Sequence, residues 1–209
     1  MTRSEVDDEL LRELERRDRV ICVVGSSKSG KTVVVKKILP DSTVIVGQVG
    51  VRGGEIWRHL CAISNIPLKY TEGLRDSIGA NAGALKGEHQ REQRNEIDLD
   101  ARRAFIEFVK RKRSIVFDDF HYFEPEAQQE ILQGLRQLLH ERVAIVIILT
   151  WYGEDQPALA ERDMLARIRF IRIPEWSGEE LQQILQKGFE ALSVKVSNAD
   201  MKQIVSRSF

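Results

Sequence analysis

The chain has 209 residues, of which 42% are hydrophobic and 31% are charged, and its 32 basic residues balance its 32 acidic residues. This length suits one domain with a small appendage and excludes a large multidomain protein. The composition excludes a disordered chain, and the zero net charge means that no overall field favours nucleic acid or a membrane as partner.

Strands and helices are predicted to alternate along the chain. Glu5 to Arg17 has leucines at helical spacing, and Val20 to Val24 is the first of five apolar runs typical of strands. The other runs are Thr43 to Val46, Ser114 to Phe117, Val143 to Leu149 and Phe170 to Ile173. Helical patterns cover Thr32 to Leu39, Glu55 to Ile63, Leu99 to Arg111 and Glu126 to Leu139. Such alternation requires crossover connections, so it predicts an α/β fold with a mostly parallel sheet covered on both faces.

Two segments depart from this alternation. Apolar residues thin out and glycines recur at about residues 67–96, which is typical of a mobile polar insertion on the surface. Beyond Pro174 no strand is predicted, and Ser177 and Glu180 form a capping-box signature for the first of two helices. These patterns divide the chain into an N-terminal helix, a core and a helical appendage, at residues 1–18, 19–174 and 175–209.

A phosphate-binding loop follows the first predicted strand. It satisfies the pattern GxxxxGK(S/T) and opens the next helix, which is the context that the motif requires; a chance match in a glycine-rich turn is the alternative. Its residues are Gly25, Ser26, Ser27, Lys28, Ser29, Gly30, Lys31 and Thr32. Backbone amides and the helix N-terminus would hold a β-phosphate. Lys31 would reach the β- and γ-phosphates, and the Thr32 hydroxyl would bind Mg²⁺.

Two adjacent carboxylates end the predicted strand at Ser114 to Phe117. Asp118 and Asp119 are therefore expected at the carboxyl edge of the sheet, where the phosphate loop also lies. Because side chains alternate along a strand, the two should point in different directions. Asp118 is the candidate to hold Mg²⁺, and Asp119 is the candidate to orient and deprotonate the attacking water. The alternative is that both acids only begin a solvated turn before His121.

About ninety residues separate these two motifs, so at least one further strand lies between them. With this spacing, the loop and the acidic pair resemble the ATPase core of the additional-strand P-loop class, most closely AAA+ proteins and the related STAND signalling ATPases. The resemblance covers about Arg19 to Leu192. It implies a three-layer fold with sheet order 5-1-4-3-2, ATP and Mg²⁺ as cofactors, and a C-terminal helical lid that starts at about residue 175. Only two lid helices precede Phe209, so either the sequence is an excerpt of a longer protein or an additional protein subunit completes the site.

The resemblance also implies two further catalytic residues. Thr150, which closes the run Val143 to Leu149, matches the polar sensor of the γ-phosphate; a hydroxyl that only caps a strand end is the alternative. Arg167 best matches the arginine that precedes the fifth strand and reaches a neighbouring subunit's nucleotide. Arg162 and Arg169 are its rivals, and ordinary surface arginines are the alternative. The resemblance therefore implies a homo-oligomer.

The expected function is Mg²⁺-dependent ATP binding and hydrolysis that drives assembly or conformational switching of a larger complex, for example in signalling or defence. No N/T-K-x-D motif is present, which argues against GTP. Most AAA+ proteins have Asp-Glu in place of Asp118-Asp119, so we expect slow or partner-stimulated hydrolysis. One alternative is a nucleic-acid-dependent ATPase of the transposition or replication-initiation type that uses the basic run Lys110 to Arg113, although such a run at a helix end is usually a solvated face. Another is an ATP-binding regulatory module with little hydrolysis.

Cysteine usage and the N-terminal sequence indicate the compartment. Cys22 and Cys61 match no metal-ligand spacing and no secreted disulfide framework, so we expect reduced thiols in the core. Residues 1–8 are too acidic for a signal peptide. The longest apolar run is far shorter than the ~20 residues of a membrane helix. We therefore expect a cytoplasmic protein with no membrane partner.

Overall fold

The computed structural model describes residues 3–68, 86–150 and 166–207. By their internal contacts the residues form two compact units, Met1–Ile173 and Pro174–Phe209. None of the helices in the described ranges is both long enough and apolar enough to cross a bilayer.

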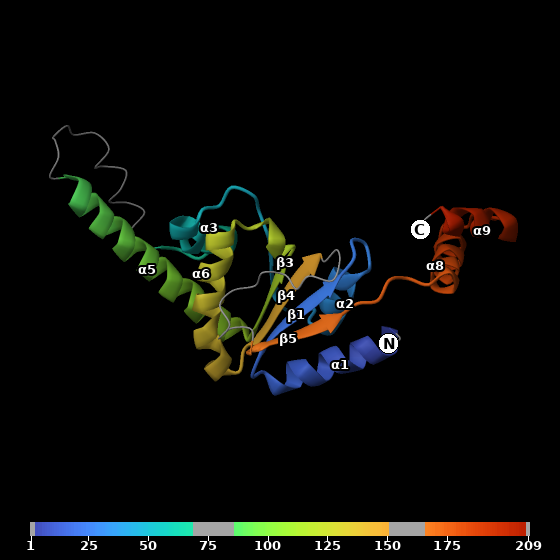
Figure 1. Ribbon diagram of the computed structural model, residues 1–209, viewed down its shortest axis with the longest axis horizontal. Coiled ribbons are helices and arrows are strands. Elements are labelled where there is room, and N and C mark those ends of the chain that lie inside the picture. Colours follow the sequence, from blue (N-terminus) through green and yellow to red (C-terminus); the bar gives the residue numbers. More distant parts are fainter. Residues whose placement is uncertain (1–2, 69–85, 151–165, 208–209) are drawn as a thin grey trace. The chain divides into compact units, whose positions relative to one another are not determined.

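A five-stranded parallel sheet forms the centre of the first unit (Figure 1). Its strands are β1 (Val20–Gly25), β2 (Thr43–Val46), β3 (Ser114–Asp118), β4 (Ala144–Thr150) and β5 (Ile168–Arg172). Their order is β2-β3-β4-β1-β5, and every pairing is parallel. Read from the opposite edge, this is the order 5-1-4-3-2, so the predicted α/β class and strand order are confirmed. The carboxyl ends of all five strands share one edge of the sheet.

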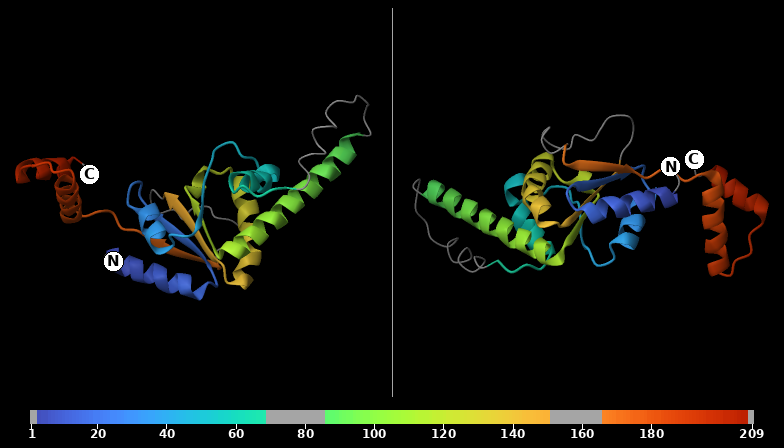
Figure 2. Two further views of the ribbon diagram at one scale, coloured as in Figure 1. Left: turned by 180° about the vertical axis from the view of Figure 1, so that it is seen from behind. Right: turned by 90° about the horizontal axis from the view of Figure 1, so that it is seen from below.

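Helices cover both faces of this sheet, as Figures 1 and 2 show. One layer contains α1 (Arg3–Arg16) and α2 (Lys31–Ile38), and the other contains α3 (Ile56–Ile63), α5 (Lys86–Lys112) and α6 (Pro125–Leu135). Side chains alternate along a strand, so neighbouring residues of β1 face different layers. Cys22 packs in the cluster that includes α3, α5 and α6, and Ile21 packs in the cluster that includes α1 and α2. The three central strands, β1, β3 and β4, are buried on both faces, which explains why they read as continuous apolar runs.

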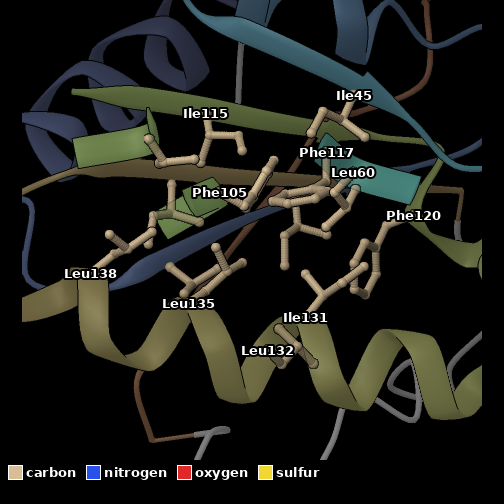
Figure 3. Close-up of a cluster of buried hydrophobic side chains, with 14 of the residues drawn as sticks. Ile45, Leu60, Phe105, Ile115, Phe117, Phe120, Ile131, Leu132, Leu135 and Leu138 are labelled. Carbon is tan, nitrogen blue, oxygen red and sulfur yellow. The ribbon is translucent and has the colours of Figure 1, made fainter. Parts of the chain in front are cut away.

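The larger core cluster lies between the sheet and α6 (Figure 3). Ile131 and Leu135 of α6 point toward Ile115 and Phe117 of β3. Phe120 packs edge-on against Phe117, with ring centroids 5.9 Å apart. Short 3-10 helices occur at Gly53–Glu55 (η1), Phe120–Tyr122 (η3) and Arg136–Glu141 (η4). Through Phe120, the core therefore anchors η3, the segment that directly follows the acidic pair.

Helix α5 begins at Lys86, which is earlier than the apolar pattern from Leu99 predicts. Its first turns fall within residues 67–96, the stretch expected to be a polar insertion; residues 69–85 lie outside the described part. Residues 87–96 contain no hydrophobic side chain. Periodicity detects only helices with an apolar face, so this part of the helix gave no signal.

The second unit contains α8 (Gly178–Ala191) and α9 (Asn198–Ser206). The predicted capping box at the start of α8 is confirmed. The Ser177 hydroxyl accepts a hydrogen bond from the Glu180 N–H at 3.2 Å, and the Glu180 carboxylate accepts one from the Ser177 N–H at 2.8 Å. These two bonds fix where the helix begins.

Candidate active site

The loop between β1 and α2 forms a tight turn at the carboxyl edge of the sheet. Lys28 and Gly30 both have left-handed backbone conformations, with φ of 61° and 90°. Gly30 is the residue that precedes the first turn of α2, and no side chain there accepts a hydrogen bond from the helix amides. The N-terminus of α2 is therefore suited to bind an anion through its backbone N–H groups.

Lys31 is 6% exposed and lies folded back over its own loop. Its Nζ donates to the carbonyl oxygens of Gly25 at 3.1 Å and Ser26 at 2.6 Å. Burial lowers the pKa of Lys31 from its ordinary value, and the nearby negative charges of Asp119 and Asp118 offset only part of this effect. A phosphate bound in the loop would supply the negative charge that this buried ammonium lacks.

Thr32 and Asp118 contact each other across the edge of the sheet. The Thr32 hydroxyl donates to Asp118 Oδ1 at 3.1 Å, and Asp118 is 8% exposed at the end of β3. Hydroxyl and carboxylate oxygens are hard ligands, and Mg²⁺ at phosphate sites is typically bound by only one or two protein groups together with water and phosphate oxygens. The two side chains therefore fit a magnesium site next to the loop.

Asp119 leaves the strand through a left-handed turn, with φ of 51° and ψ of 40°. β3 ends at Asp118, so the predicted strand alternation does not decide where the Asp119 side chain points. The Asp119 N–H donates to Asp118 Oδ1 at 3.0 Å, and the Asp119 carbonyl accepts a hydrogen bond from the Tyr122 N–H at 3.0 Å. The negative charge of Asp119 partly opposes the lowering of the Lys31 pKa by burial.

Thr150 is at the same edge of the sheet. It is the last residue of β4 and lies directly beside Gly25, the first residue of the loop, in the register of β1 and β4. Its side chain is half-buried. The structure thus brings the sensor candidate to the phosphate loop.

Arg167 lies at the opposite edge of the sheet. It immediately precedes β5, and its carbonyl accepts a hydrogen bond from the N–H of Val20, at the start of β1, at 2.9 Å. Val20 lies five residues before Gly25, the first residue of the loop, which is about 17 Å along an extended strand. Of the two rivals, Arg169 donates to Glu9 at 2.6 Å, and Arg162 lies outside the described residues. The structure does not bring Arg167 to the loop of its own chain.

In the described part of the chain, neither a reactive cysteine nor a cluster of metal-binding side chains forms a second reactive centre. Cys22 and Cys61 are buried and free, as expected of core thiols. Burial raises the pKa of Cys61 to about 11, so its thiolate is disfavoured at neutral pH. No group of three or more His, Cys, Asp or Glu side chains gathers there as a metal site.

Gly47 also belongs to this edge, although it lies in neither of the two sequence motifs. It directly follows β2, whose last residue Val46 pairs with Asp118, and the Gly47 N–H donates to the Asp118 carbonyl at 2.8 Å. Its only sequence signal is a glycine that follows a short strand. The position of this glycine next to the acidic pair is evident only from the pairing of β2 with β3.

Comparisons with known proteins identify the fold. No family model and no curated protein sequence matches the chain. Its structure resembles a STAND ATPase with a tetratricopeptide repeat sensor from Pyrococcus horikoshii (19% identity, TM-score 0.52), covering 93% of this chain and 27% of that one. It also resembles the replication initiator DnaA bound to AMPPCP and single-stranded DNA (13% identity, TM-score 0.57), covering 96% of this chain and 54% of that one. A third match is Cdc6p from Pyrobaculum aerophilum (15% identity, TM-score 0.54), covering 90% of this chain and 48% of that one.

These likenesses show that the chain has the P-loop NTPase fold found in AAA+ and STAND proteins. The chain spans about half the length of the DnaA and Cdc6p structures and about a quarter of the STAND structure.

Proposed function

We propose that this chain is the core of a P-loop ATPase that binds ATP with Mg²⁺ and hydrolyses it. The observation that carries the proposal is the hydrogen bond between Thr32 and Asp118, which are 86 residues apart in the sequence. It joins a phosphate-binding loop to a strand that ends in two carboxylates. The likeness to DnaA, which was solved with the ATP analogue AMPPCP, supports a nucleotide ligand.

Each group at the edge has a distinct role in this proposal. The amides at the N-terminus of α2 hold the β-phosphate, and Lys31 exchanges its two carbonyl partners for the β- and γ-phosphates. Thr32 and Asp118 hold Mg²⁺, which neutralises charge on the phosphates when it is bound. Asp119 orients the attacking water and accepts its proton. Thr150 senses the γ-phosphate by a hydrogen bond.

We further propose a homo-oligomer in which Arg167 acts in trans. Arg167 lies at the far edge of the sheet from its own loop, so it can stabilise a γ-phosphate only if another copy of the chain binds that nucleotide. An arginine supplied in this way is worth about 10³–10⁵ in rate. Isolated monomers should therefore hydrolyse ATP slowly, and an additional protein subunit is a second possible source of the charge.

The proposed purpose of hydrolysis is assembly or conformational switching of a larger complex in the cytoplasm, which the likeness to a STAND ATPase supports. The second candidate is a nucleic-acid-dependent ATPase, supported by the likeness to DnaA solved with single-stranded DNA. The basic run of α5 gives it little support. Lys110 Nζ lies 3.1 Å from Glu107 and 3.0 Å from Glu141, and Arg113 donates to the Glu141 carbonyl at 3.2 Å. These contacts neutralise or occupy part of the run.

Phosphate release from ATP, measured over a range of protein concentrations, tests the proposal. Parallel reactions contain single-stranded DNA, double-stranded DNA or RNA. We expect the specific activity to rise with protein concentration and to change little with any polymer. A stimulation of about tenfold or more by one polymer, equivalent to about 1.4 kcal/mol of barrier, would instead favour the nucleic-acid-dependent ATPase. ATP binding without phosphate release under every condition would favour a regulatory module.

A further inference from the structure

The chain after β2 makes an unusually close approach to the acidic pair. A methyl group built on Gly47 would overlap the carbonyl oxygen of Asp119, and it would lie 3.0 Å from the carbonyl carbon and 3.4 Å from Tyr122 Cβ. The overlapping atom belongs to the backbone, so it cannot move aside as the end of a flexible side chain could. Only glycine fits at this position without moving Asp119.

The restriction at Gly47 is steric and does not come from its own backbone conformation. The described glycines with positive φ are Gly30 and Gly50, and Gly47 is not among them. Its backbone can therefore accommodate an alanine as far as φ is concerned. A substitution here would act on what Gly47 touches, which is the backbone of Asp119.

The Asp119 carbonyl is also held by a hydrogen bond. It accepts the Tyr122 N–H at 3.0 Å, and η3 is anchored in the core by Phe120 and Phe123, whose rings pack edge-on with centroids 5.7 Å apart. A carbonyl that moved away from a methyl group at Gly47 would strain or break this hydrogen bond. The peptide that precedes Asp119 is fixed as well, because its N–H donates to Asp118 Oδ1.

We propose that Gly47 is a positioning residue that holds Asp119 in its left-handed turn and so fixes the direction of its carboxylate. The proposal rests on the proposed function, in which Asp119 orients the attacking water. Gly47 itself touches no reacting atom. A displacement of about 1 Å in such a group can cost about a hundredfold in rate.

The substitution Gly47→Ala tests this role, with Gly54→Ala as the matched control. Gly54 lies in η1, has no atom within 4 Å of a built methyl group and has no positive φ. We expect Gly47→Ala to lower kcat for ATP about tenfold or more, while the Kd for ATP changes less than about twofold. Gly54→Ala should match the wild type in both. An unchanged kcat in Gly47→Ala, or a loss confined to ATP affinity and thermal stability, would overturn the proposal.

A double-mutant cycle separates positioning from general damage. If Gly47 acts through Asp119, adding Gly47→Ala to Asp119→Asn should slow turnover no further. A second loss of similar size in the double variant would mean that the two residues act independently, which contradicts the proposal.

A readout without hydrolysis distinguishes this proposal from the ATPase assignment. The Asp119 backbone conformation can be measured by NMR, from its Cα shift and its three-bond HN–Hα coupling. We expect a left-handed φ in the wild type and in Gly54→Ala, and a changed one in Gly47→Ala. If the wild type shows no ATP turnover, the ATPase function is overturned, but the comparison of the Asp119 φ between the variants and the wild type remains valid. An unchanged Asp119 φ in folded Gly47→Ala would overturn the positioning role. A wild-type φ that is not left-handed would also overturn it, and that measurement does not depend on whether a variant folds.

Discussion

The buried ammonium of Lys31 illustrates how a binding residue costs stability. Its pKa is lowered mainly by burial, so folding disfavours its charged form. This penalty is fully present below the lowered pKa, and it disappears as the pH rises from there toward the ordinary value of 10.5. Lys31→Met removes the charge and keeps most of the volume.

We therefore expect Lys31→Met, without nucleotide, to have a higher Tm than the wild type at pH 7. The difference should shrink as the pH approaches 10.5, because the wild-type lysine loses its charge. Differential scanning calorimetry across this range measures both effects. A variant that melts below the wild type at pH 7 would show that the two carbonyl hydrogen bonds of Lys31 outweigh the cost of its burial.

Asp119→Asn should separate binding from chemistry. The amide keeps the shape of the side chain and tolerates a left-handed backbone, but it cannot accept a proton. We expect ATP and Mg²⁺ affinities close to those of the wild type, and a fall in kcat of about 10²–10⁴. Turnover at the parental rate, measured by phosphate release, would show that Asp119 is not the base.

Motif spacing pointed to the residues that the structure brings together at this edge. Lys31, Thr32, Asp118 and Asp119 stand in two short motifs whose chemistry requires a common edge, so their neighbourhood could be predicted although their roles remain proposals. Gly47 could not be predicted, because its importance depends on the register of β2 against β3 and on a contact between backbones. A contact between two backbone segments that are distant in the sequence produces no local sequence pattern.

At the scale of elements, all five strands were predicted to within about two residues. The apolar runs of β1, β3 and β4 are continuous because these central strands are buried on both faces. The strand order did not come from these runs; it came from the resemblance carried by the two motifs. The start of α5 was missed because a polar helix has no apolar period to detect.

The contact of α6 with α3 supplies a test of packing at the same scale. Gly134 on α6 is buried against Trp57 of α3, and a methyl group there would overlap Trp57 Cη2 and lie 2.5 Å from Cζ2. Overpacking costs about 1–3 kcal/mol, whereas the gain in helix propensity from Gly to Ala is at most about 1 kcal/mol. The difference is a net loss of up to about 2 kcal/mol, so we expect Gly134→Ala to lower the free energy of unfolding by an amount in this range in urea denaturation.

Gln133 is exposed on the same helix and provides the control for this experiment. Gln133→Ala should change the free energy of unfolding by less than about 0.5 kcal/mol. The clash also predicts coupling: Trp57→Phe should cost less in the Gly134→Ala background than in the wild type. Additive effects of the two substitutions would argue against this packing.

At the scale of the whole molecule, the position of Arg167 predicts complementation between subunits. Arg167→Ala keeps the base, and Asp119→Asn keeps the arginine. A mixture of the two variants would form some interfaces that pair an intact arginine with an intact base, and neither parent alone can do so. We expect each variant to be nearly inactive and the mixture to recover ATP turnover.

Two results would oppose this arrangement. Turnover that does not depend on protein concentration, together with a fully active Arg167→Ala, would exclude Arg167 as the source of the charge. The charge would then have to come from Arg162 or from another protein subunit. Absence of recovery on mixing, when both parents are inactive and mixed oligomers do form, would contradict the trans arrangement.

Calorimetric titration of the chain with ATP is the decisive experiment, because every proposed role depends on nucleotide bound at the loop. We expect one ATP per chain, tighter binding with Mg²⁺ than without it, and no measurable binding to Lys31→Met. Thr32→Val should keep ATP binding and lose most of the Mg²⁺ dependence, since it removes one of the two proposed protein ligands. Absence of ATP binding to the wild type in the presence of Mg²⁺, or equal binding by Lys31→Met, would contradict the account.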